Sequence, residues 1–459
     1  MSFEGEFASY EPLRRIIESQ RINERLRDLH IKEISPSVDS ITHDTLIAKA
    51  NLSQSGQQPD LVLAIDGSYQ AAPVLNGYPC AECGYITVAS VLLDLKKAKE
   101  LEKNEFIDPK KFRETEKTSS FEAVFPGCNI IVGNEPDAKS SLRKVLFEEM
   151  NNCHVFEDGE TLLDTYEALL KIKLDDSPEG RHPMSPIEGN ENEMTYGFGI
   201  YECPQTHKPL YSTDALRLHE LMNPSASCGE MYGQIMSAIE KLWLIHILRS
   251  FESNNWLATL RRVAFVMDGP LAVFSTASWL ANAIKKELKR INEKQKEING
   301  TDLMIIGLEK TGSFFNHFIT IDTDSNGVPG KFPIQNAFLL TDEYIKKNII
   351  YSDSVKPFGQ DTYFGRKFFY KAKSGQLLVP VDVCYTDNQF DLRTAHPNQY
   401  TRLADVMELL DNVASSRYPN SVAPLISAHA EAAIPLNLGR RLFESIANDI
   451  IRQNKDNGC

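Results

Sequence analysis

Long hydrophobic runs are missing from this 459-residue chain. Hydrophobic residues make up 42% of it and charged residues 24%, an ordinary balance for a soluble globular protein. No apolar run approaches the length that a membrane-spanning helix needs. The segment Met1 to Leu29 mixes charged and apolar residues, which is not the pattern of a secretory signal. We therefore expect a protein with no membrane segment, located in the cytoplasm.

Cysteine is also scarce, with eight residues scattered along the chain. At this density, without a secretory signal, free thiols in a reducing compartment are expected. One alternative is a zinc knuckle built from Cys80-x-x-Cys83 and Cys203-x-x-x-His207. These pairs lie far apart and no second Cys-x-x-Cys exists, so we favour ordinary loop cysteines.

An excess of positive charge is missing as well. The chain has 49 Lys and Arg against 63 Asp and Glu, a net charge of -14, which argues against a broad basic face that coats nucleic acid. An enzyme that holds DNA in a local channel is not excluded. Basic residues either follow a DNA backbone or form a solvated face. They are Lys285, Lys286, Lys289, Arg290, Lys294, Lys296, Lys346, Lys347, Arg366, Lys367, Lys371 and Lys373.

Two apolar segments each end in Asp-Gly. One runs from Leu61 to Asp66 and the other from Val263 to Asp268. Both have the length and branching of strands buried on two faces. Open α/β sheets place ligands at the carboxyl ends of such strands, and paired carboxylates suit a hard divalent cation. Asp-Gly also closes ordinary turns, but the pairing favours a metal-dependent enzyme that acts on phosphate esters.

The remaining pattern predicts an α/β protein with a mixed sheet flanked by helices. A strand, helix, strand order over 262–308 implies a parallel unit with a right-handed crossover. We expect an N-terminal helical segment at 1–60, the first part of the core at 61–96, an insertion or cap at 97–228 and the rest of the core at 229–459. Predicted helices are 9–32, 161–173, 229–252, 276–297, 400–414 and 427–452; predicted strands are 61–66, 84–95, 262–268, 302–308, 335–341 and 364–385.

A third carboxylate is expected from the helix at 229–252. Glu240 lies in its apolar middle, where a carboxylate is costly unless it is paired or binds a metal. Glu252, near the end of the helix, is the alternative. A third possibility is that Glu240 merely pairs with a lysine on the surface of the helix.

Two further side chains have suitable chemistry. Ser427 is a plausible N-cap, which places His429 in the first turn of a helix, where it would ligate a metal or transfer a proton. A lone histidine is more often structural. Lys310 follows the strand at 302–308 and would neutralise a phosphate, unless it is a solvated loop lysine. The segment Glu309 to Ser313 lacks the glycine spacing of a P-loop.

The order of these residues resembles the NurA nucleases. The resemblance rests on Asp66-Gly67-Ser68, the buried helix with Glu240, Asp268-Gly269-Pro270-Leu271, Lys310, then Tyr418-Pro419 and Ala428-His429. It covers about 61–95 and 229–450. The spacing from Tyr418 to His429 is longer than the family pattern, and the segment at 97–228 is large for the family.

The resemblance implies an RNase H-like core and divalent-metal-dependent cleavage of DNA. Asp66, Glu240 and Asp268 would be acidic metal ligands, His429 would complete the site and Tyr418 would line it. Two Mn²⁺ or Mg²⁺ ions about 4 Å apart would flank the scissile phosphate, with Lys310 steadying its charge.

The same resemblance implies partners. NurA proteins form homodimers and work with HerA, a hexameric ATP-driven DNA translocase, in DNA end resection and repair or in anti-phage defence. Alternatives are an RNase H-like nuclease acting on RNA or single strands without a translocase, and a non-catalytic adaptor with structural carboxylates. An Argonaute-type Piwi fold is disfavoured because guide-anchoring domains are absent at this length.

Overall fold

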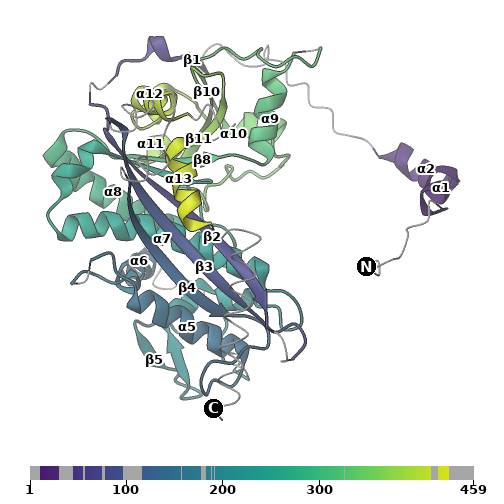
Figure 1. Ribbon diagram of the computed structural model, residues 1–459, viewed down its shortest axis with the longest axis vertical. Coiled ribbons are helices and arrows are strands. Elements are labelled where there is room, and N and C mark those ends of the chain that lie inside the picture. The colour runs from purple at the N-terminus through teal and green to yellow at the C-terminus, as the bar shows by residue number, and fades with distance from the viewer. Residues whose placement is uncertain are drawn as a thin grey trace. The chain divides into compact units, whose positions relative to one another are not determined.

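A nine-stranded mixed sheet runs through the larger of two compact units, Val38–Cys459 (Figure 1). The structure, a computed structural model, describes residues 11–29, 45–96, 116–176, 182–414 and 422–433, except 55–56, 75–77, 157, 188, 191 and 325. The strand order is β1-β9-β10-β11-β8-β7-β2-β3-β4. Their bounds are β1 Leu46–Ala48, β2 Leu61–Pro73, β3 Glu82–Asp94, β4 Glu116–Pro126, β7 Val263–Asp268, β8 Met304–Glu309, β9 Asn336–Leu339, β10 Gly365–Lys371 and β11 Leu377–Val383.

The centre of the sheet is parallel. Strand β7 pairs in parallel with both β2 and β8, and the other neighbouring strands pair antiparallel. The helices α7 Gly229–Ser253 and α8 Leu280–Asn299 precede and follow β7, so β7-α8-β8 is the expected strand, helix, strand unit. The expectation of an α/β fold with a mixed sheet flanked by helices is confirmed.

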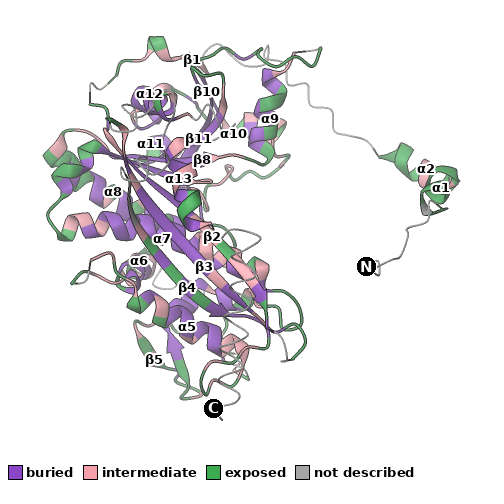
Figure 2. Cartoon of the chain, viewed as in Figure 1, coloured by how far each residue is buried: buried purple, intermediate pink, exposed green. Residues whose placement is uncertain are grey.

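Helices cover both faces of the sheet. On β2, Leu63 and Ile65 pack into one core with the helices α5 to α8, whereas Val62 and Ala64 pack into another with α12 and α13. Buried residues therefore run along the central strands and α7 (Figure 2). The remaining helices are α5 Ala138–Asn152, α6 Leu162–Asp176, α9 Ser313–Asp322, α10 Asp342–Asn348, α11 Asp387–Phe390, α12 Leu403–Val413 and α13 Ala423–Ala432.

Shorter elements complete the described chain. Strands β5 Ile200–Glu202 and β6 Pro209–Tyr211 form a separate two-stranded sheet. The 3₁₀ helices cover Lys49–Asn51, Ser212–Leu216, Leu218–Leu221, Leu257–Arg262, Ser275–Ala277 and Pro397–Gln399. The seven described cysteines are free thiols. None of the described helices combines the length and the apolar character needed to span a membrane.

The smaller unit, Met1–Ser37, contains the helices α1 Glu11–Glu18 and α2 Gln20–Asp28. A single helix over 9–32 was expected, but the helix is interrupted at Ser19. The Ser19 hydroxyl caps α2 by accepting from the Ile22 N–H at 3.4 Å.

Two other differences from the expected order concern the main unit. Strand β4 falls within 97–228, the segment expected to be an insertion, yet it pairs with β3 along its whole length. Its alternate residues Phe121, Ala123 and Phe125 are buried, which gives it a core-facing side. The segment at 364–385 is a hairpin of two strands, β10 and β11.

Candidate metal-binding active site

The register of the parallel strands brings Asp66 and Asp268 to one edge of the parallel part of the sheet, although β2, predicted to end at Asp66, continues to Pro73 beside β3. Ile65 on β2 is paired with Met267 on β7, so the next residue of each strand is an aspartate. Asp66 is only 3% exposed, and its Oδ1 accepts from the Gly67 N–H at 2.8 Å. Burial, together with the charges of Asp268 and Glu240, raises the pKa of Asp66 to about 6. Burial is the larger cause of this shift, and the two neighbouring carboxylates add to it.

Glu240 reaches the same edge from α7. A Cβ added at Gly67 would lie 2.7 Å from Glu240 Oε1, so only a glycine allows this oxygen to lie against β2 beside Asp66. The other oxygen, Oε2, accepts from Lys241 Nζ at 2.6 Å. Burial raises the pKa of Glu240, and the Lys241 ammonium acts against that rise. The two carboxylate oxygens thus have different surroundings.

The alternative carboxylate, Glu252, lies elsewhere. Its two oxygens accept from Arg290 at 2.7 and 2.6 Å, and one also binds Lys294. Hydrogen bonding from Arg290 above all lowers the pKa of Glu252 to about 2. Of the two candidates for the third carboxylate, the geometry favours Glu240.

His429 joins the site from α13, on the opposite face of the sheet to α7. Its Nδ1 lies 2.8 Å from Asp66 Oδ2, and the ring stays 61% exposed. The predicted cap at Ser427 is wrong: α13 begins after Val422, with Pro424 in its first turn, and His429 lies in the last turn. A proline fits the start of a helix because its missing N–H costs no hydrogen bond there.

Lys310 lies beside Asp268, since Lys310 Nζ donates to Asp268 Oδ2 at 2.8 Å. The turn that follows Asp268 folds over β8, where a Cβ at Gly307 would lie 2.6 Å from the carbonyl oxygen of Gly269. Gly269 itself has a φ of 77°. Asp268-Gly269 is therefore a tight turn, as the plainer interpretation held, and it also delivers a carboxylate to the site.

These residues fit a divalent cation by donor chemistry. Carboxylate oxygens and an imidazole are common ligands of Mn²⁺ and Mg²⁺, and the raised pKa of Asp66 shows charge that a cation would offset. As the side chains stand, no three described His, Cys, Asp or Glu residues are arranged to hold an ion. Instead, each carboxylate is paired with a basic side chain of the chain: His429, Lys241 or Lys310.

Three contributors to the site were not predicted. Gly67 and Gly307 permit close approaches that only the folded structure reveals. Lys241 had a visible signal, because a lysine beside Glu240 in an apolar helix needs a partner when it is buried. Tyr418 lies outside the described residues, so its place at the site stays a prediction.

The zinc knuckle, the alternative to ordinary loop cysteines, finds no support among the described residues. The Cys203 thiol contacts Gln205 and Asn190, and His207 pairs with Glu202. Across the described ranges no three potential ligands gather around a metal position, and Cys80 and Cys83 belong to no such group.

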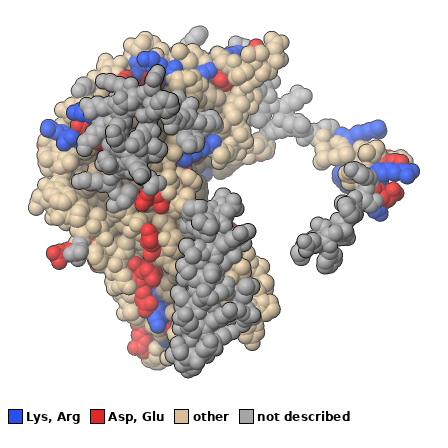
Figure 3. All heavy atoms as spheres, viewed as in Figure 1, with Lys and Arg blue, Asp and Glu red and all other residues tan. Residues whose placement is uncertain are grey.

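Most of the basic residues expected along a DNA path already have partners. Arg366, Lys367 and Lys371 are buried, and they bind main-chain carbonyls, Glu309 and Asp322 respectively. That part of the expectation is wrong. Lys296, on α8, pairs with Asp302. The face seen in Figure 3 carries acidic side chains along its lower part, in keeping with the net charge of -14.

Comparison with known proteins gives one extended match. A family model described as NurA domain matches residues 60–434. No curated protein matches.

Solved structures that match the chain include "Crystal structure of the NurA nuclease from Sulfolobus solfataricus". The identity is 13% and the TM-score 0.33, and the match covers 97% of this chain and 98% of that one. Two more are "Crystal structure of NurA" and "Crystal structure of NurA with manganese", with 12% and 11% identity and TM-scores of 0.24 and 0.23. Each covers 96% of this chain and 98% of its own.

Proposed function

The chain belongs to the NurA family, and from that membership together with the carboxylate site we propose that it is a metal-dependent DNA nuclease. The observation that carries the proposal is the meeting of Asp66, Glu240 and Asp268 at one sheet edge. Three separate elements, β2, α7 and β7, deliver them there. Burial and the neighbouring carboxylates raise the pKa of Asp66, and such a perturbed pKa is typical of sites that bind cations or carry out acid–base chemistry.

The strand order supports an RNase H-like core within the larger sheet. Strands β4, β3 and β2 form an antiparallel ribbon, and β7 and β8 add to β2 in parallel, with α7 and α8 in the connections. In that arrangement the first and fourth core strands lie side by side. Asp66 follows the stretch of β2 that pairs with β7, Asp268 ends β7, and the helix α7 between these strands carries Glu240.

Each residue of the site has a chemical task in phosphodiester hydrolysis. Asp66, Glu240 and Asp268 would hold divalent ions, which activate water and stabilise the leaving oxygen when bound. Lys310, next to Asp268, is placed to neutralise charge on the phosphate. His429, bound to Asp66, would ligate an ion or give a proton to the leaving 3′ oxygen.

Manganese is the ion we propose first, because carboxylates together with an imidazole suit it, with magnesium as the alternative. We also propose that two chains form a homodimer and that a HerA-type hexameric translocase feeds DNA to it in the cytoplasm. The net charge of -14 supports this division of labour, because an acidic nuclease gains affinity for DNA from a partner. End resection in repair and anti-phage defence are the two roles that follow.

The test is cleavage of end-labelled linear duplex DNA with Mn²⁺, with and without a HerA-type partner. We expect wild-type cleavage that is lost in Asp66→Asn, which keeps the shape of the side chain and removes its charge. Asp324→Asn, which changes a half-buried aspartate in the loop after α9, is the matched control. Equal cleavage by Asp66→Asn would remove Asp66 from the chemistry.

No cleavage by the wild type under any condition would favour the non-catalytic adaptor. The pairs that His429, Lys241 and Lys310 make with the carboxylates would then be structural. Cleavage of RNA or single strands alone, unaffected by the partner, would favour the nuclease that acts without a translocase.

A further inference from the structure

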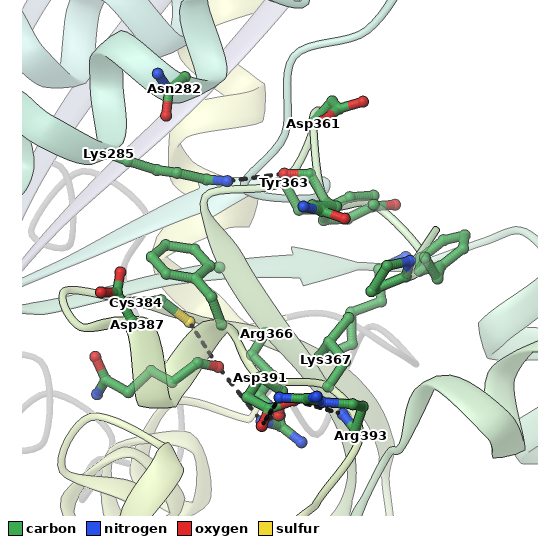
Figure 4. A pocket seen from close by; sticks show the side chains of 18 of the residues that line it. Asn282, Lys285, Asp361, Tyr363, Arg366, Lys367, Cys384, Asp387, Asp391 and Arg393 are labelled. Atoms are coloured by element: carbon green, nitrogen blue, oxygen red, sulfur yellow. Dashed lines mark hydrogen bonds and ion pairs between the residues drawn. The ribbon is translucent and has the colours of Figure 1, made fainter. Parts of the chain in front are cut away.

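A cavity of about 880 Å³ lies between α8 and the strand pair β10–β11 (Figure 4). Lysines from α8 form one wall, and the segments at 357–363 and 384–393 form the others. All of its lining residues lie within the described chain. Its size is in the range of small-ligand sites.

The lining of this cavity is basic. Six Lys or Arg side chains line it against three Asp and no Glu, in a chain whose net charge is -14. Arg366 and Lys367 are occupied by main-chain carbonyls and Glu309, and Arg393 by Asp391. On α8, Lys286 pairs with Asp176 and Lys289 with Glu293, so the positive charge that remains is that of Lys285, and it favours an anionic ligand.

Lys285 carries that remaining charge. Its Nζ donates to the carbonyl oxygen of Gln360 at 3.0 Å and lies 4.5 Å from the centre of the Phe390 ring. Within the described chain no carboxylate comes within ion-pair distance of Lys285, whereas its neighbour Lys286 pairs with Asp176. Burial lowers the pKa of Lys285. A phosphate oxygen would supply the counter-charge that this ammonium lacks.

Aromatic rings flank the lysine. Phe390 lies beneath its ammonium, and Tyr363 and Phe358 line the wall across from α8, with their ring centres 5.5 Å apart. Cations interleaved with aromatic rings are how proteins hold unpaired nucleotides, because the phosphate takes the cation and the base stacks on a ring.

The cavity wall is joined to the catalytic edge. Val273 N–H donates to Thr362 O and Phe364 N–H to Leu271 O, both at 2.9 Å, so the segment carrying Tyr363 is bonded to the chain that leaves Asp268. Lys367, on the cavity floor, binds Glu309, whose neighbour Lys310 binds Asp268. Only a few residues of the protein chain therefore separate this cavity from the catalytic edge, and a DNA strand bound at that edge would pass close to the cavity.

We propose that the cavity binds an unpaired nucleotide of single-stranded DNA, with Lys285 on its phosphate and Phe390 against its base. The inference rests on the proposed nuclease function and adds a second, non-catalytic contact that holds one separated strand beside the site. Binding there lowers KM and leaves the chemical step to the carboxylates.

The test uses the full chain with the metal chelated, so that no cleavage occurs. Fluorescence anisotropy follows an oligothymidylate of about 12 nucleotides and an abasic oligomer of equal length and charge. We expect Lys285→Met to weaken binding of both oligomers about tenfold and to reduce the slope of log affinity against log salt by about 0.7, while Lys285→Arg retains binding. Phe390→Leu weakens only the oligothymidylate, by about fivefold.

The matched control is Lys208→Met, which removes one exposed lysine charge between β5 and β6, at the opposite end of the main unit from β10 (Figure 1). It should bind both oligomers as the wild type does. Affinities of Lys285→Met and Phe390→Leu equal to the wild type would overturn the inference. If Phe390→Leu loses as much affinity for the abasic oligomer as for the oligothymidylate, the stacking role of Phe390 is refuted.

The outcomes separate this inference from the function beneath it. If the wild type cleaves duplex DNA and Lys285→Met binds the oligomers with unchanged affinity, only the proposal for the cavity is refuted. If the wild type cleaves no DNA but binds the oligomers specifically through Lys285 and Phe390, the nuclease proposal is refuted. The cavity would then stand as a nucleotide-binding site.

Discussion

At the scale of single residues, the site depends on the lack of a side chain at position 67. Gly67 has no side chain, and that absence lets Glu240 Oε1 lie against β2. The close approach is invisible in the sequence, because Asp66-Gly67 has the same letters as any turn. The aspartates were predictable, since each ends an apolar run of the sequence, although the strand β2 itself continues past Asp66 to Pro73. The glycine beside one of them matters for a contact made with a helix more than 170 positions away.

Gly67→Ala should therefore reduce cleavage by at least about tenfold, because the added Cβ displaces the Glu240 carboxylate. Gly233→Ala, on α7, is the control: its Cβ would meet only the Tyr69 ring at 3.4 Å. Because Gly233 lies inside α7, one turn from its start, that change should stabilise the fold by up to about 1 kcal/mol. Cleavage rates and thermal unfolding of both variants check the prediction, and full activity in Gly67→Ala would contradict it.

Lys241→Met should destabilise the protein by about 3 kcal/mol, because it leaves the buried Glu240 carboxylate without its partner. Adding Glu240→Gln should recover part of that loss. Lys296→Met breaks an exposed pair with Asp302 and should cost less than about 1 kcal/mol. Urea unfolding gives all three values, and equal costs for the two lysines would refute the assignment.

At the scale of elements, the apolar pattern of the sequence predicts the helices and the central strands, but it does not predict the residues at which they begin and end. The predicted helices at 229–252 and 276–297 match α7 and α8 to within a few residues. Strand β4 was missed although Phe121, Ala123 and Phe125 alternate along it, because a charge-rich stretch precedes it. The start of α13 was misplaced because Ser427 looked like a cap, whereas the helix begins at Ala423 with Pro424 in its first turn.

Asp137→Ala should destabilise α5 by about 1 kcal/mol. The Asp137 side chain caps this helix by accepting from the Ser140 N–H at 2.7 Å, and alanine leaves that donor unsatisfied. Glu148→Ala, on an exposed position of the same helix, should change stability by less than about 0.5 kcal/mol. Chemical unfolding measures both, and a cost for Glu148→Ala as large as that for Asp137→Ala would argue against a capping role.

At the scale of the whole molecule, stability should fall as the pH drops from 6.5 towards 4. Burial lowers the pKa of His246 and of His317 to about 4, so the unfolded chain takes up these protons at a higher pH than the folded one does. The stabilisation is complete above the unfolded pKa of about 6.5 and is lost as the pH falls through the folded value. The expected loss between pH 7 and pH 5 is about 2 kcal/mol for each histidine, or about 4 kcal/mol for the two together.

Urea unfolding at several pH values checks this loss. The double variant His246→Gln, His317→Gln should show a flatter dependence on pH between 7 and 5 than the wild type. His207→Gln, which changes an exposed histidine, should leave the dependence unchanged. A double variant with the wild-type slope would assign the loss to other groups.

The bond between Asp66 and His429 joins residues 363 positions apart in the chain. At ribosomal speeds of about 5 to 20 residues per second, roughly 20 to 70 seconds separate the synthesis of the two partners. A nascent or prematurely terminated polypeptide therefore has its aspartates but not its imidazole. If the histidine is needed for cleavage, unfinished chains are harmless to the genome of the cell that makes them, and the finished chain acquires its activity in one late docking step.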